Sequence, residues 1–186
     1  MTNIINEKRI DQITTFLKSL NVKSKRFSEI IRAENISAIQ DFNQAFTHSS
    51  DNKVTNYEKL EFFGDAVLRL AASNFIEKKY PQMSVGQRSE LRAQIVSDEW
   101  LTKLGKKIDI EKLIIKGPKA LGDENAKNTI IAEATEALIG AVYKCFNSIQ
   151  EVNLWLDHIW EEDSENFLKA PYKFKSNDKY SQRTEN

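Results

Sequence analysis

Three acidic residues fall on one face of a long, otherwise largely apolar segment, and this pattern limits how the chain can fold. Residues 57–68 read YEKLEFFGDAVL, in which Glu58, Glu61 and Asp65 stand at i, i+3 and i+7. On a helix this spacing puts the three carboxylates on one face. Each pair of like charges there costs about 0.2–0.5 kcal/mol, so a positive partner is expected. A hard divalent cation, which prefers oxygen ligands, is the simplest candidate.

A second acidic pair lies far downstream in a more apolar helix. Residues 130–143 are rich in Ala, Ile, Leu and Val and contain Glu133 and Glu136 three positions apart. Acids in a helix that buries most of its surface need partners, so the two acidic helices are predicted to pack side by side and bring five carboxylates together. Gly64, in the middle of the first helix, costs about 1 kcal/mol relative to Ala and indicates close approach of another helix.

The alternative for both acidic groups is an ordinary solvated helix face. For the three upstream acids, that alternative explains neither the flanking apolar residues nor Gly64. For the downstream pair taken alone the two interpretations stand about even, because either glutamate could cap a helix or pair with a lysine such as Lys127.

Four segments, in this order and spacing, resemble the ribonuclease III family. Residues 58–68 resemble its signature helix, residues 45–50 (AFTHSS) its upstream element, and residues 91–97 the helix after the signature. The downstream acidic helix is the fourth. Several ordered motifs are more specific than any single pattern, and together they span about residues 10–160.

The resemblance implies an all-helical homodimer that cuts both strands of double-stranded RNA with a divalent metal and leaves 5′ phosphates. Matched by position, the implied metal ligands are Glu61, Asp65, Glu133 and Glu136, and Asp65 and Glu136 are the implied catalytic pair. The expected ion is Mg²⁺, with Mn²⁺ as a substitute. It would activate a water molecule and stabilise the charge that grows on the phosphate and the leaving oxygen.

The resemblance also assigns residues outside the metal cluster. Glu58 matches the first acid of the signature, at an acidic rim that contacts RNA, and Phe62 matches an aromatic residue that inserts into the partner subunit. Arg88, Arg92 and Lys127 are expected to contact RNA phosphates, because recognition of A-form duplexes relies on shape and backbone. The alternatives are a core phenylalanine for Phe62 and a solvated surface for the basic residues.

Two positions depart from the family pattern. The family usually has Asp where this chain has Glu133, and the extra methylene moves the carboxylate by about 1.5 Å. Because Mg²⁺ demands near-octahedral ligation at about 2.1 Å, this shift could change the metal geometry. Val85 stands where many members carry another acid. Loss of that acid should lower the charge at the edge of the cleft without abolishing cleavage.

Length and composition suit one domain. The chain has 186 residues, of which 40% are hydrophobic and 29% charged, and a net charge of zero. We expect a catalytic domain over residues 1–166 and a flexible, basic, polar tail over residues 167–186. That tail is too short for the C-terminal double-stranded-RNA-binding domain that bacterial members commonly append. With no membrane-length apolar run and no signal-peptide pattern, a cytoplasmic protein is expected.

Apolar periodicity predicts about seven to nine helices and no convincing strand. The predicted helices cover residues 9–19, 28–33, 36–47, 56–79, 87–96, 98–108, 125–146 and 149–169, with an irregular connection at 110–117.

The leading hypothesis is a metal-dependent endoribonuclease that hydrolyses double-stranded or structured RNA, in the processing of ribosomal or other RNA. The alternative is a catalytically silent, dimeric, ribonuclease III-like module that binds RNA. Silent members typically lose the acids, whereas Glu61, Asp65 and Glu136 are all present here, which favours the enzyme. A helical metal-dependent nucleotide hydrolase is a weaker third hypothesis, because no His-Asp pair accompanies the acids.

Overall fold

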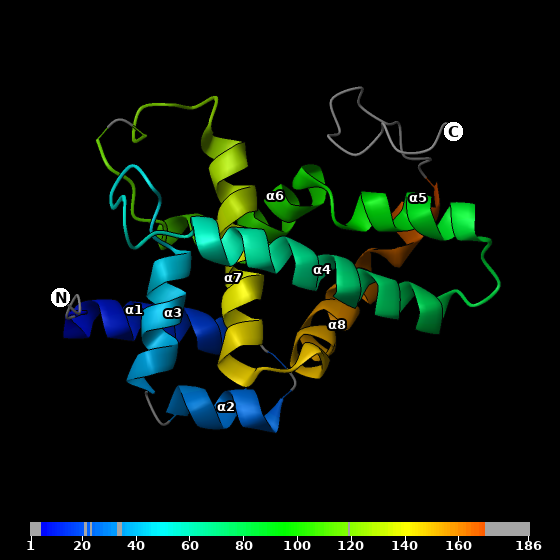
Figure 1. Ribbon diagram of the computed structural model, residues 1–186, viewed down its shortest axis with the longest axis horizontal. Helices are drawn as coiled ribbons and strands as arrows, with labels where there is room; N and C mark the ends of the chain where they lie inside the picture. The colour runs from blue at the N-terminus through cyan, green and yellow to red at the C-terminus, as the bar shows by residue number, and fades with distance from the viewer. Residues whose placement is uncertain (1–4, 21, 23, 33–34, 119, 170–186) are drawn as a thin grey trace.

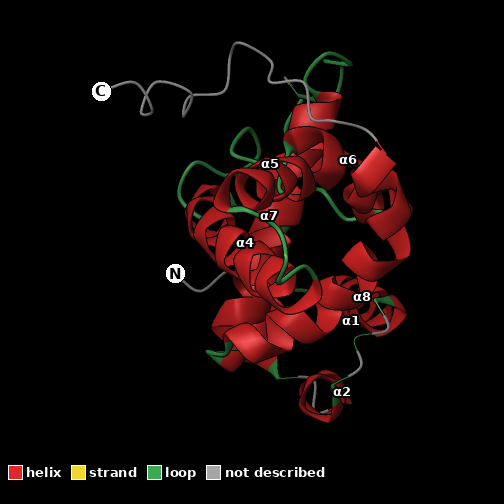
Figure 2. Ribbon diagram, turned by 90° about the vertical axis from the view of Figure 1, so that its right-hand side faces the viewer, coloured by secondary structure: helices red, strands yellow, loops and turns green. Residues whose placement is uncertain are grey.

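Helices form nearly all of the regular structure in the computed structural model, which describes residues 5–20, 22, 24–32, 35–118 and 120–169 (Figure 1). Over these residues the fold is all-α, as predicted, and Figure 2 shows only helices and loops there. The elements are α1 (Glu7–Ser19), α2 (Lys25–Arg32), α3 (Ile36–Ala45), α4 (Glu58–Lys79), α5 (Val85–Ile95), α6 (Asp98–Lys107), the 3-10 helix η1 (Ile110–Lys112), α7 (Lys127–Phe146) and α8 (Ile149–Lys169).

Helix α7 lies at the centre of the molecule. It packs against α3, α4, α6, α8 and η1, and most of its side chains are buried. A helix that is covered on every side must be apolar on every side, which explains the run of Ala, Ile, Leu and Val in the sequence. Glu133 and Glu136 are its only acidic residues. Both therefore stand out against an apolar background.

Helices α4 and α7 cross with their backbones in contact (Figure 1). A Cβ atom added at Gly64 of α4 would lie 2.0 Å from the carbonyl oxygen of Glu136, and one added at Gly140 of α7 would lie 2.4 Å from the carbonyl oxygen of Leu60. Only glycine fits at either position. The predicted close approach at Gly64 is confirmed, and the crossing places the start of α4 beside the acidic part of α7.

Helix α8 packs against the C-terminal half of α4 and also contacts α7. Its Trp160 is fully buried, with its ring 5.3 Å from that of Phe75 and 5.6 Å from that of Trp100. The indole N–H donates to the carbonyl oxygen of Ile95 at 3.3 Å. Buried aromatic rings contribute large apolar areas, so this cluster fixes α4, α5, α6 and α8 relative to one another.

Most helix ends lie one to three residues from the predicted ones, and at α5 the reason is local. Helix α5 begins at Val85, two residues earlier than expected, because Ser84 and Gln87 form a capping box around its first turn. In the predicted irregular connection, η1 is followed by an isolated parallel bridge between Thr47 and Ile115. This bridge joins two loops and starts no sheet among the described residues.

The predicted boundary between domain and tail falls inside α8. That helix continues to Lys169, so the first three residues of the expected tail are helical. The rest of the tail lies outside the described residues, and its flexibility stays a prediction. No helix in the described part of the chain is both long and apolar enough to cross a membrane.

Candidate functional site

Glu61 lies in the first turn of α4, where the crossing with α7 surrounds it with other acids. Its pKa rises from 4.5 to about 7, first because the side chain is half-buried and then because Glu133, Glu58, Asp65 and Asp98 repel its charge. Such long-range repulsion requires that these carboxylates share one region of the surface. The structure thus brings acids of the two helices together, as predicted.

Glu136 is the most strongly perturbed acid of this group. Burial is the largest cause, followed by the charges of Asp65, Glu61 and Asp98, and together they raise its pKa to about 8. Arg69 opposes the shift, but it does not cancel it. At neutral pH the surroundings therefore favour the protonated form of Glu136. Acids perturbed in this way are typical of functional sites.

Arg69 is the basic residue that contacts one of these acids. Its Nε donates to both carboxylate oxygens of Asp65, at 2.8 and 3.0 Å. Asp65 and Arg69 stand at i and i+4 on α4, a spacing at which opposite charges meet on a helix. Sequence reasoning missed this pair, although that spacing was a usable signal. The arginine orients Asp65 and offsets part of its charge.

Glu133 is held by a residue just before α4. The hydroxyl of Tyr57, which is 1% exposed, donates to Oε2 of Glu133 at 2.5 Å. Burial and this hydrogen bond raise the pKa of Tyr57 far above its usual range. The suggested pairing of Glu133 or Glu136 with Lys127 is wrong, because Lys127 pairs with Glu111 at 3.0 Å.

Asp98 adds negative charge that sequence reasoning did not find. It lies in the first turn of α6, whose N-cap Ser97 accepts a hydrogen bond from the N–H of Trp100 at 3.2 Å. It reaches the acids because α6 packs tightly on α7: a Cβ at Gly105 would lie 2.5 Å from Cγ2 of Ile131. No local pattern in the sequence reveals a contact that depends on this packing.

The donor set fits a hard cation such as Mg²⁺, because it consists of carboxylates that repel one another. In the described part of the chain, however, no three carboxylate, histidine or cysteine groups already form a coordination shell. Two of the acids are engaged elsewhere, Asp65 with Arg69 and Glu133 with Tyr57. Binding a cation would require the Asp65 side chain to turn toward it, whereas Glu133 could use its second oxygen, with the helix backbones staying in place.

Arg88 has a structural role that the sequence did not suggest. Its guanidinium pairs with Glu77 and donates to the carbonyl oxygens of Met83, at 2.9 Å, and Pro81, at 2.8 Å. It thereby fastens the turn between α4 and α5. Glu77 is about 18 Å further along α4 than Asp65, at about 1.5 Å of rise per residue. The structure does not bring Arg88 to the acids, and its contact with RNA stays a prediction.

The other two basic candidates, Arg92 and Lys127, lie at the surface. Arg92 is exposed, and its Nη1 donates to the hydroxyl of Ser73 on α4 at 3.2 Å. Lys127 begins α7 and is half-buried in its ion pair with Glu111. Val85, where an acid was expected from the family pattern, is 81% exposed at the start of α5. Phosphate contacts by Arg92 and Lys127 stay predictions.

Phe62 points away from the core of the single chain. Its side chain is 84% exposed, so the alternative of an ordinary core phenylalanine is wrong. Ala66 and Leu70 follow on the same face of α4, and Leu70 is 50% exposed. Glu58 is exposed in the same first turn, where its N–H donates to the side chain of Asn56 at 3.0 Å. An exposed apolar stripe therefore runs beside the acids.

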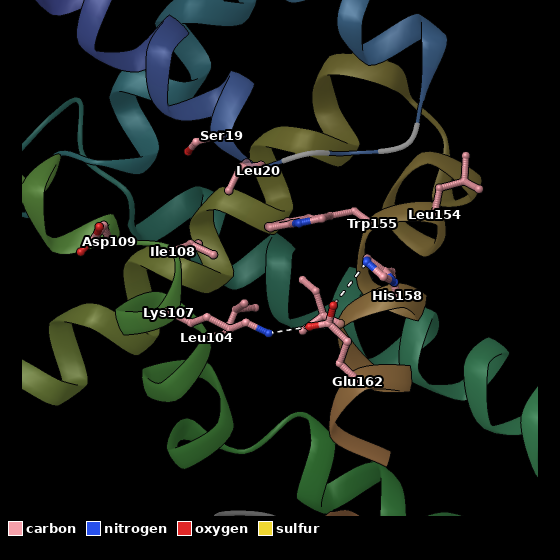
Figure 3. Close-up of a pocket in the computed structure, with 11 residues that line it drawn as sticks. Ser19, Leu20, Leu104, Lys107, Ile108, Asp109, Leu154, Trp155, His158 and Glu162 are labelled. Carbon is pink, nitrogen blue, oxygen red and sulfur yellow. Dashed lines mark hydrogen bonds and ion pairs between the residues drawn. The ribbon is translucent and has the colours of Figure 1, made fainter. Parts of the chain in front are cut away.

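A separate pocket of about 390 Å³ lies between α1, α6 and α8 (Figure 3). Trp155 lines it, and Glu162 pairs with Lys107 of α6 at 2.7 Å and with His158 of its own helix at 3.3 Å. None of the predicted site residues lines this pocket. The acids of α4 and α7 remain the candidate site.

The stability of the metal-free protein is expected to fall as the pH rises from about 5 to about 8. Unfolded, Glu61 and Glu136 ionise near 4.5, whereas in the folded chain their pKa values are about 7 and about 8. The folded state therefore binds more protons within this window, and the free energy of unfolding decreases as the pH increases. Thermal unfolding in EDTA at pH 5.5 and pH 8 measures the difference.

The double variant Glu61→Gln/Glu136→Gln provides the control for this pH dependence. It should flatten the dependence, since the amides do not titrate. A midpoint that rises toward pH 8 in the natural chain, or an equal slope in both proteins, would contradict the assignment.

Comparisons with known proteins identify the family of the chain. A family model described as ribonuclease-III-like matches residues 40–153. Ribonuclease 3 of Prochlorococcus marinus is 45% identical over 173 residues, which cover 93% of this chain and 69% of that protein. A ribonuclease 3 of Synechocystis is 38% identical over 122 residues, which cover 65% of this chain and 50% of that protein. The chain thus spans about half to two-thirds of these curated relatives.

Solved structures give the same result. The nuclease domain of ribonuclease III from Campylobacter jejuni superimposes with a TM-score of 0.61 and 26% identity, covering 84% of this chain and 97% of that domain. A region of that domain is involved in dimer formation. The chain therefore belongs to the ribonuclease III family of endoribonucleases, and its described helices have the fold of the family's nuclease domain.

Proposed function

We propose that the protein is a metal-dependent endoribonuclease that hydrolyses phosphodiester bonds of double-stranded or structured RNA and leaves 5′-phosphate products. One observation carries the proposal: the glycine crossing of α4 and α7 gathers acids, and burial together with their mutual repulsion raises the pKa of Glu61 to about 7 and that of Glu136 to about 8. Such a cluster is poorly stabilised without a cation. A cytoplasmic role in the processing of ribosomal or other RNA completes the proposal.

The proposed metal ligands are Glu61, Asp65, Glu133 and Glu136, with Mg²⁺ as the ion and Mn²⁺ as a substitute. When bound, the ion would supply an activated water molecule and stabilise negative charge at the phosphate. The chain supplies the rigid arrangement: the backbone contact at the crossing fixes the two pairs of acids relative to each other. The proposed catalytic pair, Asp65 and Glu136, interacts across this crossing.

The RNA backbone is proposed to follow α4 from the acids toward α5. Asp65, Arg69 and Ser73 stand at i, i+4 and i+8 on one face of α4, and Arg92 reaches this row through Ser73. The cationic groups of Arg69 and Arg92 and the hydroxyl of Ser73 suit a phosphate chain. Glu58 and Lys127 are proposed to contact RNA at the other end of the site.

We also propose a homodimer formed through the apolar stripe of Phe62, Ala66 and Leu70. An exposed apolar stripe next to a site of high charge is typical of an interface. The related nuclease domain from Campylobacter jejuni has a region involved in dimer formation. Pairing through α4 would put the two sites of a dimer on either side of one interface.

Phe62→Asp is expected to convert the dimer to a monomer, because a charge buried in an apolar interface loses its solvation. Sedimentation velocity measures the change. Ile36→Asp is the matched control, since Ile36 is 65% exposed at the start of α3 and should leave the dimer intact. A stable dimer of the Phe62→Asp protein would defeat the interface assignment.

The test of the proposed function is cleavage of a labelled RNA duplex. The natural chain should cut the duplex in Mg²⁺ or Mn²⁺, leave 5′ phosphates, and show no activity in EDTA. A single-stranded RNA of the same sequence is the control for structure. A chain that stays dimeric and binds the duplex without cutting it would instead be the catalytically silent RNA-binding module.

A further inference from the structure

The hydroxyl of Tyr57 makes one contact that links the two acidic helices. It donates to Oε2 of Glu133 at 2.5 Å, across 76 residues of sequence. Tyr57 is the residue before α4 and is 1% exposed, whereas Glu133 lies in the middle third of α7. A hydrogen bond to a carboxylate is stronger than one between neutral groups. It holds the Glu133 side chain in one direction.

Tyr57 is itself held rigidly. Its backbone N–H donates to the carbonyl oxygen of Thr47 at 2.9 Å, and its ring lies edge-on to that of His48 with centroids 5.4 Å apart. His48 is fixed in turn, because its N–H donates to the carbonyl oxygen of Ile115 at 2.9 Å and its Nδ1 accepts from the N–H of Ser50 at 3.0 Å. The hydroxyl therefore has little freedom to follow a moving partner.

This rigidity determines which oxygen of Glu133 is available. Oε2 is occupied by Tyr57, so Oε1 remains for another partner. Glu133 is also the largest charge acting on Glu61, which places their carboxylates near each other. A donated hydrogen bond removes rotamer freedom that the Glu133 side chain would otherwise lose when a ligand binds.

We propose that Tyr57 is a positioning residue that holds Oε2 of Glu133 and presents Oε1 to a divalent cation shared with Glu61. This inference rests on the proposed function. It predicts an effect of the hydroxyl alone, since the ring packs against His48 and would do so equally in phenylalanine. Partners that orient a metal ligand typically change metal affinity by about 10–100-fold.

The test is the dissociation constant of Mn²⁺, measured by calorimetry without RNA. Tyr57→Phe is expected to weaken binding by about 10–100-fold. In a Glu133→Ala background the same substitution should have almost no further effect, because the side chain that it orients is gone. Tyr80→Phe, which removes a hydroxyl at the far end of α4, is the matched control and should bind as the natural chain does. Circular dichroism and thermal midpoints verify the fold of each variant.

The outcomes separate this inference from the function on which it rests. Normal binding by Tyr57→Phe, or an equal loss in both backgrounds, overturns the positioning role and leaves the metal site intact. Failure of the natural chain to bind Mn²⁺ overturns both the positioning role and the proposed metal site. If duplex cleavage then persists in EDTA, the chain is a nuclease that does not depend on metal.

Discussion

Asp65→Asn is expected to lower cleavage of duplex RNA by about 10²-fold or more, because removal of one group that stabilises transition-state charge typically has an effect of this size. The substitution keeps the shape of the side chain and removes its charge. Asp65 is the largest charge that raises the pKa of Glu136, so its loss also relieves repulsion inside the site. The variant should therefore be inactive but nearly as stable as the natural chain in EDTA.

Loss of cleavage without loss of stability distinguishes a functional acid from a structural one. The ion pair with Arg69 is partly exposed, and such pairs contribute only about 0–1 kcal/mol to stability. Asp41→Asn is the matched control, since Asp41 pairs with Lys144 at 2.7 Å and is not among the proposed site residues. It should cleave normally. An Asp65→Asn protein that cleaves at the natural rate would remove Asp65 from the catalytic assignment.

The helices could be predicted from sequence because their signal is local. Apolar residues recur with the helical period in α1, α4 and α8, and Tyr80 with Pro81 marks the end of α4. In α7 the apolar residues cover every face, which predicted burial correctly. The pairing of α4 with α7 could also be predicted, because a glycine in mid-helix and two sets of acids suggested that these two helices cross.

The contacts that complete the site could not be predicted from the sequence in the same way. Tyr57 adjoins the signature, yet its partner Glu133 is 76 residues away, and Asp98 approaches the acids only because α6 packs on α7. Arg88 has a structural role that its charge alone did not indicate: its guanidinium pairs with Glu77 of α4 and donates to two carbonyl oxygens of the α4–α5 turn. Composition and spacing report what a side chain can bind, and only packing reports what it does bind.

Gly64→Ala is expected to destabilise the chain by about 3 kcal/mol or more, at the upper end of the overpacking range. The new Cβ would lie 2.0 Å from the carbonyl oxygen of Glu136, and a backbone atom in a central helix cannot move aside as a flexible side chain can. Urea unfolding measures the loss. Because relief requires α4 and α7 to separate, the acids of the two helices should also move apart, and Mn²⁺ affinity should fall with stability.

Gly86→Ala is the matched control for this prediction. Gly86 lies in the first turn of α5, where the nearest group to an added Cβ is the Ser84 hydroxyl at 4.0 Å. Alanine there should stabilise the chain by up to about 1 kcal/mol, because it restricts the unfolded state and favours the helix. If the two variants were equally stable, the crossing would be too loose to hold the acids in register, and the site would have to be assembled by RNA or metal instead of by the fold.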